Sequence, residues 1–212
     1  MGYNDCMRSV FEKYPYSKYL LFWPIYGIVF LLMEKALVVD HYHTIHIFLD
    51  DHIPFLEIFF IPYVLWYFYL LFIHVYTLKY DTESFVKLMK YLISTFSVAM
   101  AICFVFPNCQ ELRPSEFPRN NFLTDCVMIL YTVDTNTNVF PSMHVIGSFG
   151  VLFAAINSKG LDTAPVRTLF WFITIIICSS TVFIKQHSLL DVFAGIVISV
   201  IAYCLIYKRR PV

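Results

Sequence analysis

The sequence predicts an all-α membrane protein, a polytopic bundle of about six transmembrane helices. Hydrophobic residues make up 59% of the chain and charged residues only 14%, whereas about a quarter of a typical soluble domain is charged. Long apolar segments recur along the chain, with short polar segments between them. The 212 residues suffice for about six spans of roughly 20 residues each, so we expect residues 1–212 to form a single domain.

The apolar segments give the bounds of the predicted spans. They run over residues 20–39, 54–78, 87–106, 139–156, 167–184 and 189–207. The fourth segment is short by itself, and it reaches spanning length only if its helix starts near Pro141. Within it, the small residues Gly147, Gly150 and Ala154 predict close packing against neighbouring helices.

The basic residues predict the orientation of the bundle. An even number of spans puts both termini on one side, and eleven of the fifteen Lys and Arg residues fall on that side. The other four are Lys35, Arg113, Arg119 and Lys185. Because cytoplasmic loops carry an excess of Lys and Arg, we expect cytoplasmic termini. The loops 34–53, 107–138 and 185–188 are then expected to face outward together.

Residues 138–144, which end in the sequence PSMH, enter the fourth predicted span. Proline suits the first turn of a helix, where its missing N–H needs no partner. The free N–H groups and the positive dipole end of such a turn bind anions, and the Ser142 hydroxyl can add a donor. His144 is expected on the same turn, facing the anion. The alternative is a capping segment with an interfacial histidine.

Residues 186–191, which end in the sequence HSLLD, open the sixth predicted span. A spacing of four places His187 and Asp191 on one helix face. A carboxylate that accepts from one imidazole nitrogen leaves the other nitrogen free to attack or to carry protons. Asp191 lies in an apolar run, where ionisable side chains are usually functional. The alternative is a purely structural His–Asp pair.

Arg113 lies in the second outward loop and has the geometry to bind a phosphate oxyanion through two N–H groups. An Arg-Pro dipeptide by itself is more often a solvated turn. The evidence for a phosphate-binding role of Arg113 is that it is predicted to lie on the same face as the two histidines. Together these groups fit phosphoryl transfer through a phosphohistidine, with no cofactor and no metal ion.

The three segments resemble the motifs of the phosphatidic acid phosphatase type 2 superfamily. This family includes lipid phosphate phosphatases and inositol-phosphate transferases of sphingolipid synthesis, and its motifs are written K-x6-R-P, P-S-G-H and S-R-x5-H-x3-D. Here they correspond to residues 106–114, 141–144 and 180–191. The run at 49–55, followed by Pro62-Tyr63 and Trp66, is also similar to bacterial members.

Three positions depart from the family pattern. Phe106 stands in the place of the lysine, Thr181 in the place of the second arginine, and Met143 in the place of the glycine. The two lost cations put the usual phosphate clamp in doubt, although Arg119 or Lys185 could replace them from nearby loop positions. A large residue at position 143 resembles the branch that contains the inositol-phosphorylceramide synthases.

The resemblance implies a role for each residue. His187 attacks phosphorus while Asp191 orients its imidazole. His144 protonates the leaving group and then deprotonates water or an acceptor alcohol. Arg113, the Ser142 hydroxyl and the backbone N–H groups near Met143 hold the phosphoryl oxygens.

Two other groups of residues suggest alternatives. His41, His43, His46 and His52, with Asp40, Asp50 and Asp51, form a dense outward cluster. Such a composition can bind zinc, but the spacing matches no closed site, so we expect structural or pH-tuned roles. Cys109 and Cys126 share one polar loop and could form a disulfide if that loop faces an oxidising compartment.

The sequence therefore predicts a metal-independent lipid phosphatase that acts on a phospholipid or polyprenyl phosphate. The alternatives are a lipid headgroup phosphotransferase of the inositol-phosphorylceramide synthase type and a non-catalytic lipid-binding or transport relative. The zero net charge gives no reason to expect nucleic acid as a partner. The compact length and the family resemblance favour the bacterial inner membrane, with the active site facing outward.

Overall fold

The structure is a computed structural model that describes residues 13–36 and 39–208. Arg8, Arg209 and Arg210, which entered the orientation argument, lie outside the described residues. The main elements are α2 (Phe22–Ala36), α3 (Phe60–Tyr80), α4 (Thr82–Val105), α5 (Phe122–Val133), α6 (Met143–Ile156), α7 (Ala164–Phe183) and α8 (Leu189–Ile206). Short 3-10 helices cover Pro15–Leu21, Phe48–His52 and Glu57–Phe59, and two short strands, β1 (His43–Thr44) and β2 (Asn108–Cys109), pair in parallel.

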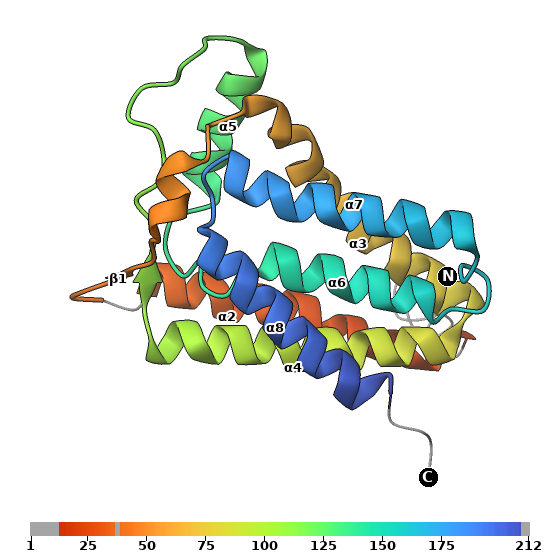
Figure 1. Ribbon diagram of the computed structural model, residues 1–212. Coiled ribbons are helices and arrows are strands. Elements are labelled where there is room, and N and C mark those ends of the chain that lie inside the picture. Colours follow the sequence, from red (N-terminus) through yellow and green to blue (C-terminus); the bar gives the residue numbers. More distant parts are fainter. Residues whose placement is uncertain (1–12, 37–38, 209–212) are drawn as a thin grey trace, which may run out of the picture.

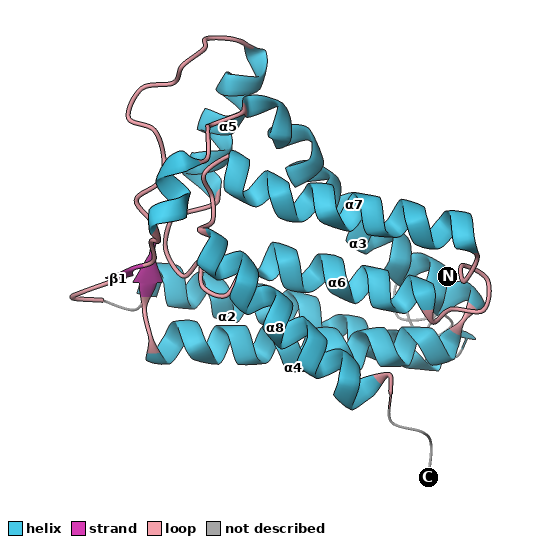
Figure 2. Cartoon of the chain, in the orientation of Figure 1, coloured by secondary structure: helices cyan, strands magenta, loops and turns pink. Residues whose placement is uncertain are grey.

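The predicted all-α membrane bundle is confirmed (Figure 2). Five helical segments of the described chain are long and apolar enough to cross a membrane. They are Pro15–Lys35, Glu57–Tyr80, Thr82–Val105, Ala164–Phe183 and Leu189–Ile206. These segments match five of the six predicted spans, and each predicted bound lies within a few residues of a helix end.

Helix α6 differs from the prediction because it starts at Met143 and has 14 residues. At 1.5 Å per residue it is about 21 Å long, which is shorter than the roughly 30 Å apolar core of a bilayer. Eleven of its residues are buried, and α3, α4, α7 and α8 all contact it (Figure 1). It is therefore the central helix of the bundle.

Two glycines allow α6 to occupy this central position. A Cβ atom on Gly147 would lie 2.8 Å from Cζ2 of Trp66, and one on Gly150 would lie 2.7 Å from Cε1 of Tyr91. Contacts this short are not tolerated without movement of the neighbouring ring. The predicted close packing along this segment is thus confirmed, and Trp66 and Tyr91 are the side chains that use the space.

The three loops expected to lie together do so at one end of the bundle (Figure 1). The β1–β2 pair joins the first of these loops to the second, where His43 pairs with Asn108. The Gln110 side chain donates a 2.9 Å hydrogen bond to the Lys185 carbonyl in the third loop. The 3-10 helix that precedes α2 begins at the other end, where α8 also ends. We call these the loop end and the terminal end. Which end faces the cytoplasm stays a prediction.

Within the second loop, the expectation of irregular structure was wrong for residues 122–133. Asn121 caps α5 there, since its side-chain oxygen accepts from the N–H groups of Leu123 and Thr124. Cys109 and Cys126 are both free thiols, so the disulfide considered above is not formed.

At the terminal end, Asp81 connects two turns of the chain. Its carboxylate accepts hydrogen bonds from the N–H and the hydroxyl of Ser84, at 3.1 and 2.9 Å. It also accepts from the Ser158 hydroxyl at 2.8 Å and the Lys159 N–H at 3.2 Å. Burial raises the pKa of Asp81, but these hydrogen bonds outweigh burial and hold the pKa below its ordinary value. Asp81 thereby ties the α3–α4 turn to the α6–α7 loop.

Candidate active site

His187 and Asp191 form the predicted pair at the start of α8. Nδ1 of His187 lies 3.1 Å from Oδ2 of Asp191. The same carboxylate oxygen accepts a 2.9 Å hydrogen bond from the Ser188 N–H. Both side chains are buried. A carboxylate in this position holds the Nδ1 proton of the imidazole, so Nε2 carries a free lone pair.

A second buried carboxylate, Asp50, fixes the start of α8 from the first outward loop. Its two oxygens accept hydrogen bonds from the Ser188 hydroxyl at 2.6 Å and from the Leu189 N–H at 2.9 Å. The Ile47 N–H donates to it at 2.9 Å. Two carboxylates next to the first turn of one helix interact favourably with the positive end of the helix dipole. Asp50 is therefore structural, as expected for the His/Asp cluster.

His144 lies on the first turn of α6, between two aromatic rings of α3. Its ring centroid is 4.2 Å from that of Tyr63 and 4.3 Å from that of Trp66. The His187 ring is 5.9 Å away. Tyr63 is held in turn by a hydrogen bond from its hydroxyl to Asp134. The two histidines predicted to act together are thus neighbours, and the aromatic rings leave His144 little rotational freedom.

A backbone contact joins the two histidine motifs directly. The Ser142 N–H donates a 3.1 Å hydrogen bond to the Asp191 carbonyl. Ser142 is fully buried and caps α6, its hydroxyl oxygen accepting from the Val145 N–H at 3.4 Å. A Cβ atom on Gly195 would lie 3.0 Å from the Ser142 carbonyl oxygen. The starts of α6 and α8 therefore meet with no side chain between them.

Both histidines line a cavity of about 300 Å³ at the loop end. The wall comes from α2, α3, α4 and α6 and from the loops that precede α6 and α8. Its polar members include Asp134, Thr135, Thr137, Asn138, Gln186 and the two histidines. Met143 also lines the cavity, and its sulfur accepts a hydrogen bond from the Tyr26 hydroxyl.

Unpartnered polar atoms concentrate around this cavity. Five buried side-chain nitrogen or oxygen atoms of the described residues have no hydrogen-bond partner, and four of them are at this site. They are Nε1 of Trp66, Oδ1 of Asn138, Nε2 of His144 and Oδ1 of Asp191. Because buried polar groups are nearly always paired, this concentration of unpaired groups sets the surroundings of the two histidines apart.

Backbone strain falls at the same place. Lys185 and Asn138 are the two non-glycine residues with positive φ in the described chain, at 56° and 53°. Lys185 directly precedes Gln186-His187, and Asn138 lies just before the Pro141 turn. Asparagine adopts this conformation more readily than lysine, so Lys185 is the more strained residue. Strained backbone of this kind is concentrated at functional sites.

Arg113 reaches the cavity through Gln186. The guanidinium donates to Oε1 of Gln186 at 3.0 and 2.6 Å and to the carbonyls of Tyr131 and Asp134 at 3.1 and 2.5 Å. It also lies over the Tyr131 ring, 4.2 Å from its centroid. Burial lowers the pKa of Arg113 from its ordinary value. Most of its donors are committed within the protein, so it mainly holds Gln186 toward the histidines.

The other two cations predicted to bind phosphate, Lys185 and Arg119, lie away from the histidine cavity. Nζ of Lys185 donates a 2.8 Å hydrogen bond to the Asp50 carbonyl, and this side chain lines a separate cavity of about 610 Å³. Burial lowers the pKa of Lys185. Arg119 forms a two-pronged ion pair with Glu57, with both N–O distances at 2.7 Å. The structure therefore brings neither cation to the histidines.

Phe106 and Thr181 stand at the two positions where the family motifs have cations, and they make apolar or local contacts. Phe106 stacks on His43 with a centroid distance of 4.4 Å and an interplanar angle of 10°. The Thr181 hydroxyl donates to the Cys178 carbonyl at 2.8 Å. Sequence reasoning missed Asn138 and Gln186 as cavity residues, although both lie within the segments that it singled out.

The outward His/Asp cluster does not assemble as a metal site. His46 pairs with Asp51 at 2.8 Å, and Nδ1 of His52 lies 3.0 Å from the Phe48 carbonyl oxygen. Across residues 13–36 and 39–208, no group of three or more His, Cys, Asp or Glu side chains is placed to hold a metal ion.

Comparison with known proteins identifies a family. The family model described as PAP2 superfamily matches residues 87–211, more than half of the chain. The matched segment begins in α4 and includes Arg113, both histidines and Asp191. Asp50 and the aromatic residues of α3 lie outside it. No curated protein and no solved structure matches the chain.

Proposed function

The chain belongs to the PAP2 superfamily, and we propose that it is a membrane lipid phosphatase that transfers a phosphoryl group from a lipid phosphate or diphosphate to water. Membership implies phosphatase-type activity on phosphorylated substrates. The observation that carries the proposal is that His187, paired with Asp191, lines the same cavity as His144. The apolar helices that bear the site suit a lipid substrate.

In the first step, Nε2 of His187 attacks phosphorus. The N–P bond forms as the bond from phosphorus to the lipid oxygen breaks, and His144 gives a proton to the departing oxygen. The carboxylate of Asp191, 3.1 Å from Nδ1, stabilises the positive charge that develops on His187. The two ring centroids are 5.9 Å apart, so the two imidazoles belong to one site.

In the second step, water attacks the phosphohistidine. His144, now unprotonated, takes a proton from the water as the new P–O bond forms and the N–P bond breaks. Inorganic phosphate leaves and His187 is regenerated. The mechanism requires no metal ion, so activity is expected to survive exhaustive chelation.

The phosphoryl oxygens need donors other than a cluster of cations. The first turn of α6 offers the free N–H groups of Met143 and His144, with Ser142 at the cap. Gln186 adds a side-chain amide that Arg113 fixes in place. We propose these groups as the phosphate-binding set, with Lys185 and Arg119 acting only indirectly.

The proposal is tested by phosphate release from mixed lipids by the purified protein. His187→Ala should abolish release, by roughly a thousandfold or more, while the variant stays folded. His52→Ala is the matched control, since this exposed histidine is also at the loop end but does not line the cavity. Vanadate should inhibit the wild type. Wild-type turnover by His187→Ala would eliminate the nucleophile assignment.

Transfer to an alcohol is a second candidate because of Met143. Its side chain lines the cavity where the family motif has glycine, and it contacts Tyr26 of α2. Such a side chain could exclude water from the phosphoenzyme and favour a larger acceptor. Labelled lipid incubated with and without an acceptor alcohol separates the two reactions, since a transferase forms a new phosphodiester in place of free phosphate.

A further inference from the structure

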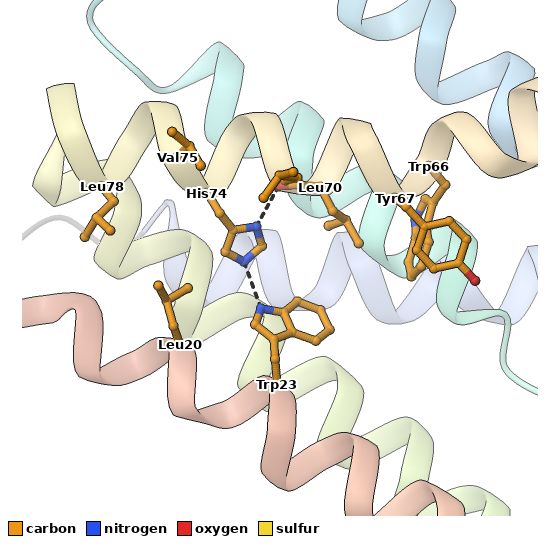
Figure 3. Close-up of a pocket in the computed structure, with 9 residues that line it drawn as sticks. Leu20, Trp23, Trp66, Tyr67, Leu70, His74, Val75 and Leu78 are labelled. Carbon is orange, nitrogen blue, oxygen red and sulfur yellow. Dashed lines mark hydrogen bonds between the residues drawn. The ribbon is translucent and has the colours of Figure 1, made fainter. Parts of the chain in front are cut away.

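An apolar groove runs along α3 beside the histidine cavity. It has a volume of about 360 Å³ and lies between α2 and α3. Trp23, Trp66 and Tyr67 line both the groove and the histidine cavity, so the two spaces adjoin. Figure 3 shows Trp66 and Tyr67 at one end of the groove and Leu20 and Leu78 at the other.

The groove lies within the part of the bundle expected to be in the membrane. From Trp66 to Leu78 is twelve residues along α3, or about 18 Å at 1.5 Å per residue. Both residues belong to the membrane-span candidate Glu57–Tyr80. An apolar chain that leaves the histidine cavity along this path would lie parallel to α3.

A polar contact joins the two helices without adding an unpaired polar group to the groove. Nε1 of Trp23 donates a 3.2 Å hydrogen bond to Nε2 of His74, whose Nδ1 lies 2.7 Å from the Leu70 carbonyl oxygen (Figure 3). Both imidazole nitrogens are thereby satisfied. Only 11% of the α2 span is buried, so this contact is important in fixing the separation of α2 from α3.

A second apolar groove lies on the other side of α2 but has no connection to the site. It is formed by α2 and α4, with Val29, Met33 and Phe104 among its lining residues. It shares no lining residue with the histidine cavity. Of these two grooves, the α2–α3 groove is therefore the one that adjoins the histidines and is placed to take an apolar chain.

We propose that the α2–α3 groove binds the single apolar chain of a lipid phosphate whose phosphoryl group lies between His144 and His187. This inference rests on the proposed function and narrows its substrate class to one-chain lipid phosphates, such as polyprenyl or monoacyl phosphates. The groove supplies binding energy for the chain, and the histidines act on the headgroup.

The first test compares two substrates that differ only in chain length, octadecyl phosphate and butyl phosphate. Val75→Trp places a large ring in the groove at a residue that is already 55% exposed, so the fold should tolerate it. Leu65→Trp is the matched control, on the same helix and 39% exposed, but absent from the groove lining.

Val75→Trp should lower kcat/KM for octadecyl phosphate about tenfold, since that corresponds to lost contact with roughly two methylene groups. It should leave butyl phosphate unchanged, and Leu65→Trp should leave both unchanged. An equal loss on both substrates, or no loss on octadecyl phosphate, would overturn the groove assignment. Failure of the wild type to hydrolyse either phosphate would instead refute the proposed function.

A second test requires no turnover. Octadecyl phosphate with a diazirine halfway along its chain is photolysed with the protein in vesicles, and the labelled peptides are identified by mass spectrometry. Octadecanol with the same diazirine controls for labelling from the bilayer. Phosphate-dependent labelling of α2 and α3 at the groove supports the proposal. Phosphate-dependent labelling at the α2–α4 groove, or identical patterns from both probes, contradicts it.

Discussion

Asp81 and Asp191 each lie beside the first turn of a helix, at opposite ends of the bundle. Both oxygens of Asp81 are used, with four hydrogen bonds from three residues. Asp191 uses one oxygen, for His187 and the Ser188 N–H, while Oδ1 is buried without a partner. A completed network holds two turns together, whereas the incomplete one is next to the cavity with the two histidines. The two carboxylates therefore differ in use: Asp81 is saturated by hydrogen bonds within the protein, and Asp191 keeps one oxygen unpaired beside His187.

Among the carboxylates, the largest effect is expected at Asp191. Asp191→Asn keeps the shape of the side chain but loses the charge that stabilises a positive His187, so we expect kcat to fall by roughly a thousandfold. Initial rates of phosphate release measure this, with thermal unfolding in detergent as a check on the fold. Asp81→Asn should keep the wild-type rate per folded molecule. Equal loss of activity in both variants would remove the distinction between the two ends.

A smaller effect is expected at Asp50, which holds the start of α8 without lining the histidine cavity. Asp50→Asn removes one acceptor from the Ser188–Leu189 turn, and small displacements of catalytic groups are costly. We expect kcat to fall about tenfold. Asp51→Asn is the matched control, because Asp51 is the next residue in the chain and its carboxylate pairs with the exposed His46. If both variants have the same rate, Asp50 does not position His187.

The smallest effect concerns stability in acid. The folded-state pKa of Asp81 lies below its ordinary value of 3.8, so its carboxylate stabilises the fold above that value. This stabilisation is lost as the pH falls through the folded-state pKa. The melting temperature of the wild type should therefore decline more steeply below about pH 4 than that of Asp81→Asn. Parallel declines would show that Asp81 contributes nothing to the acid sensitivity.

The features predicted well from the sequence are those set by local pattern. Apolar runs located the spans, and the four-residue spacing of His187 and Asp191 places them on one helix face in any α-helix. The PSMH segment located the start of α6 to within two residues, although Pro141 precedes the Ser142 cap and does not lie in the first turn. Helix α5 was missed because its 12 residues lie within a loop that is otherwise polar.

Contacts between residues far apart in the sequence could not be predicted from such local patterns. Arg113 binds Gln186, 73 residues away, and Asp50 binds Ser188, 138 residues away. Nothing in either local sequence indicates its partner. The central position of α6 was also unforeseen, because an apolar helix buried by protein and one exposed to lipid have the same composition.

Direct detection of the covalent intermediate tests the central claim, that His187 carries the phosphoryl group. The enzyme is mixed with substrate, quenched during turnover under conditions that preserve phosphohistidine, digested and analysed by mass spectrometry. His144→Asn should retain the intermediate longer, because it lacks the base that activates water. We predict a phosphoryl group on His187 that disappears as phosphate is released. A phosphoryl group on another residue, or phosphate release with no phosphoenzyme in either protein, would contradict the mechanism.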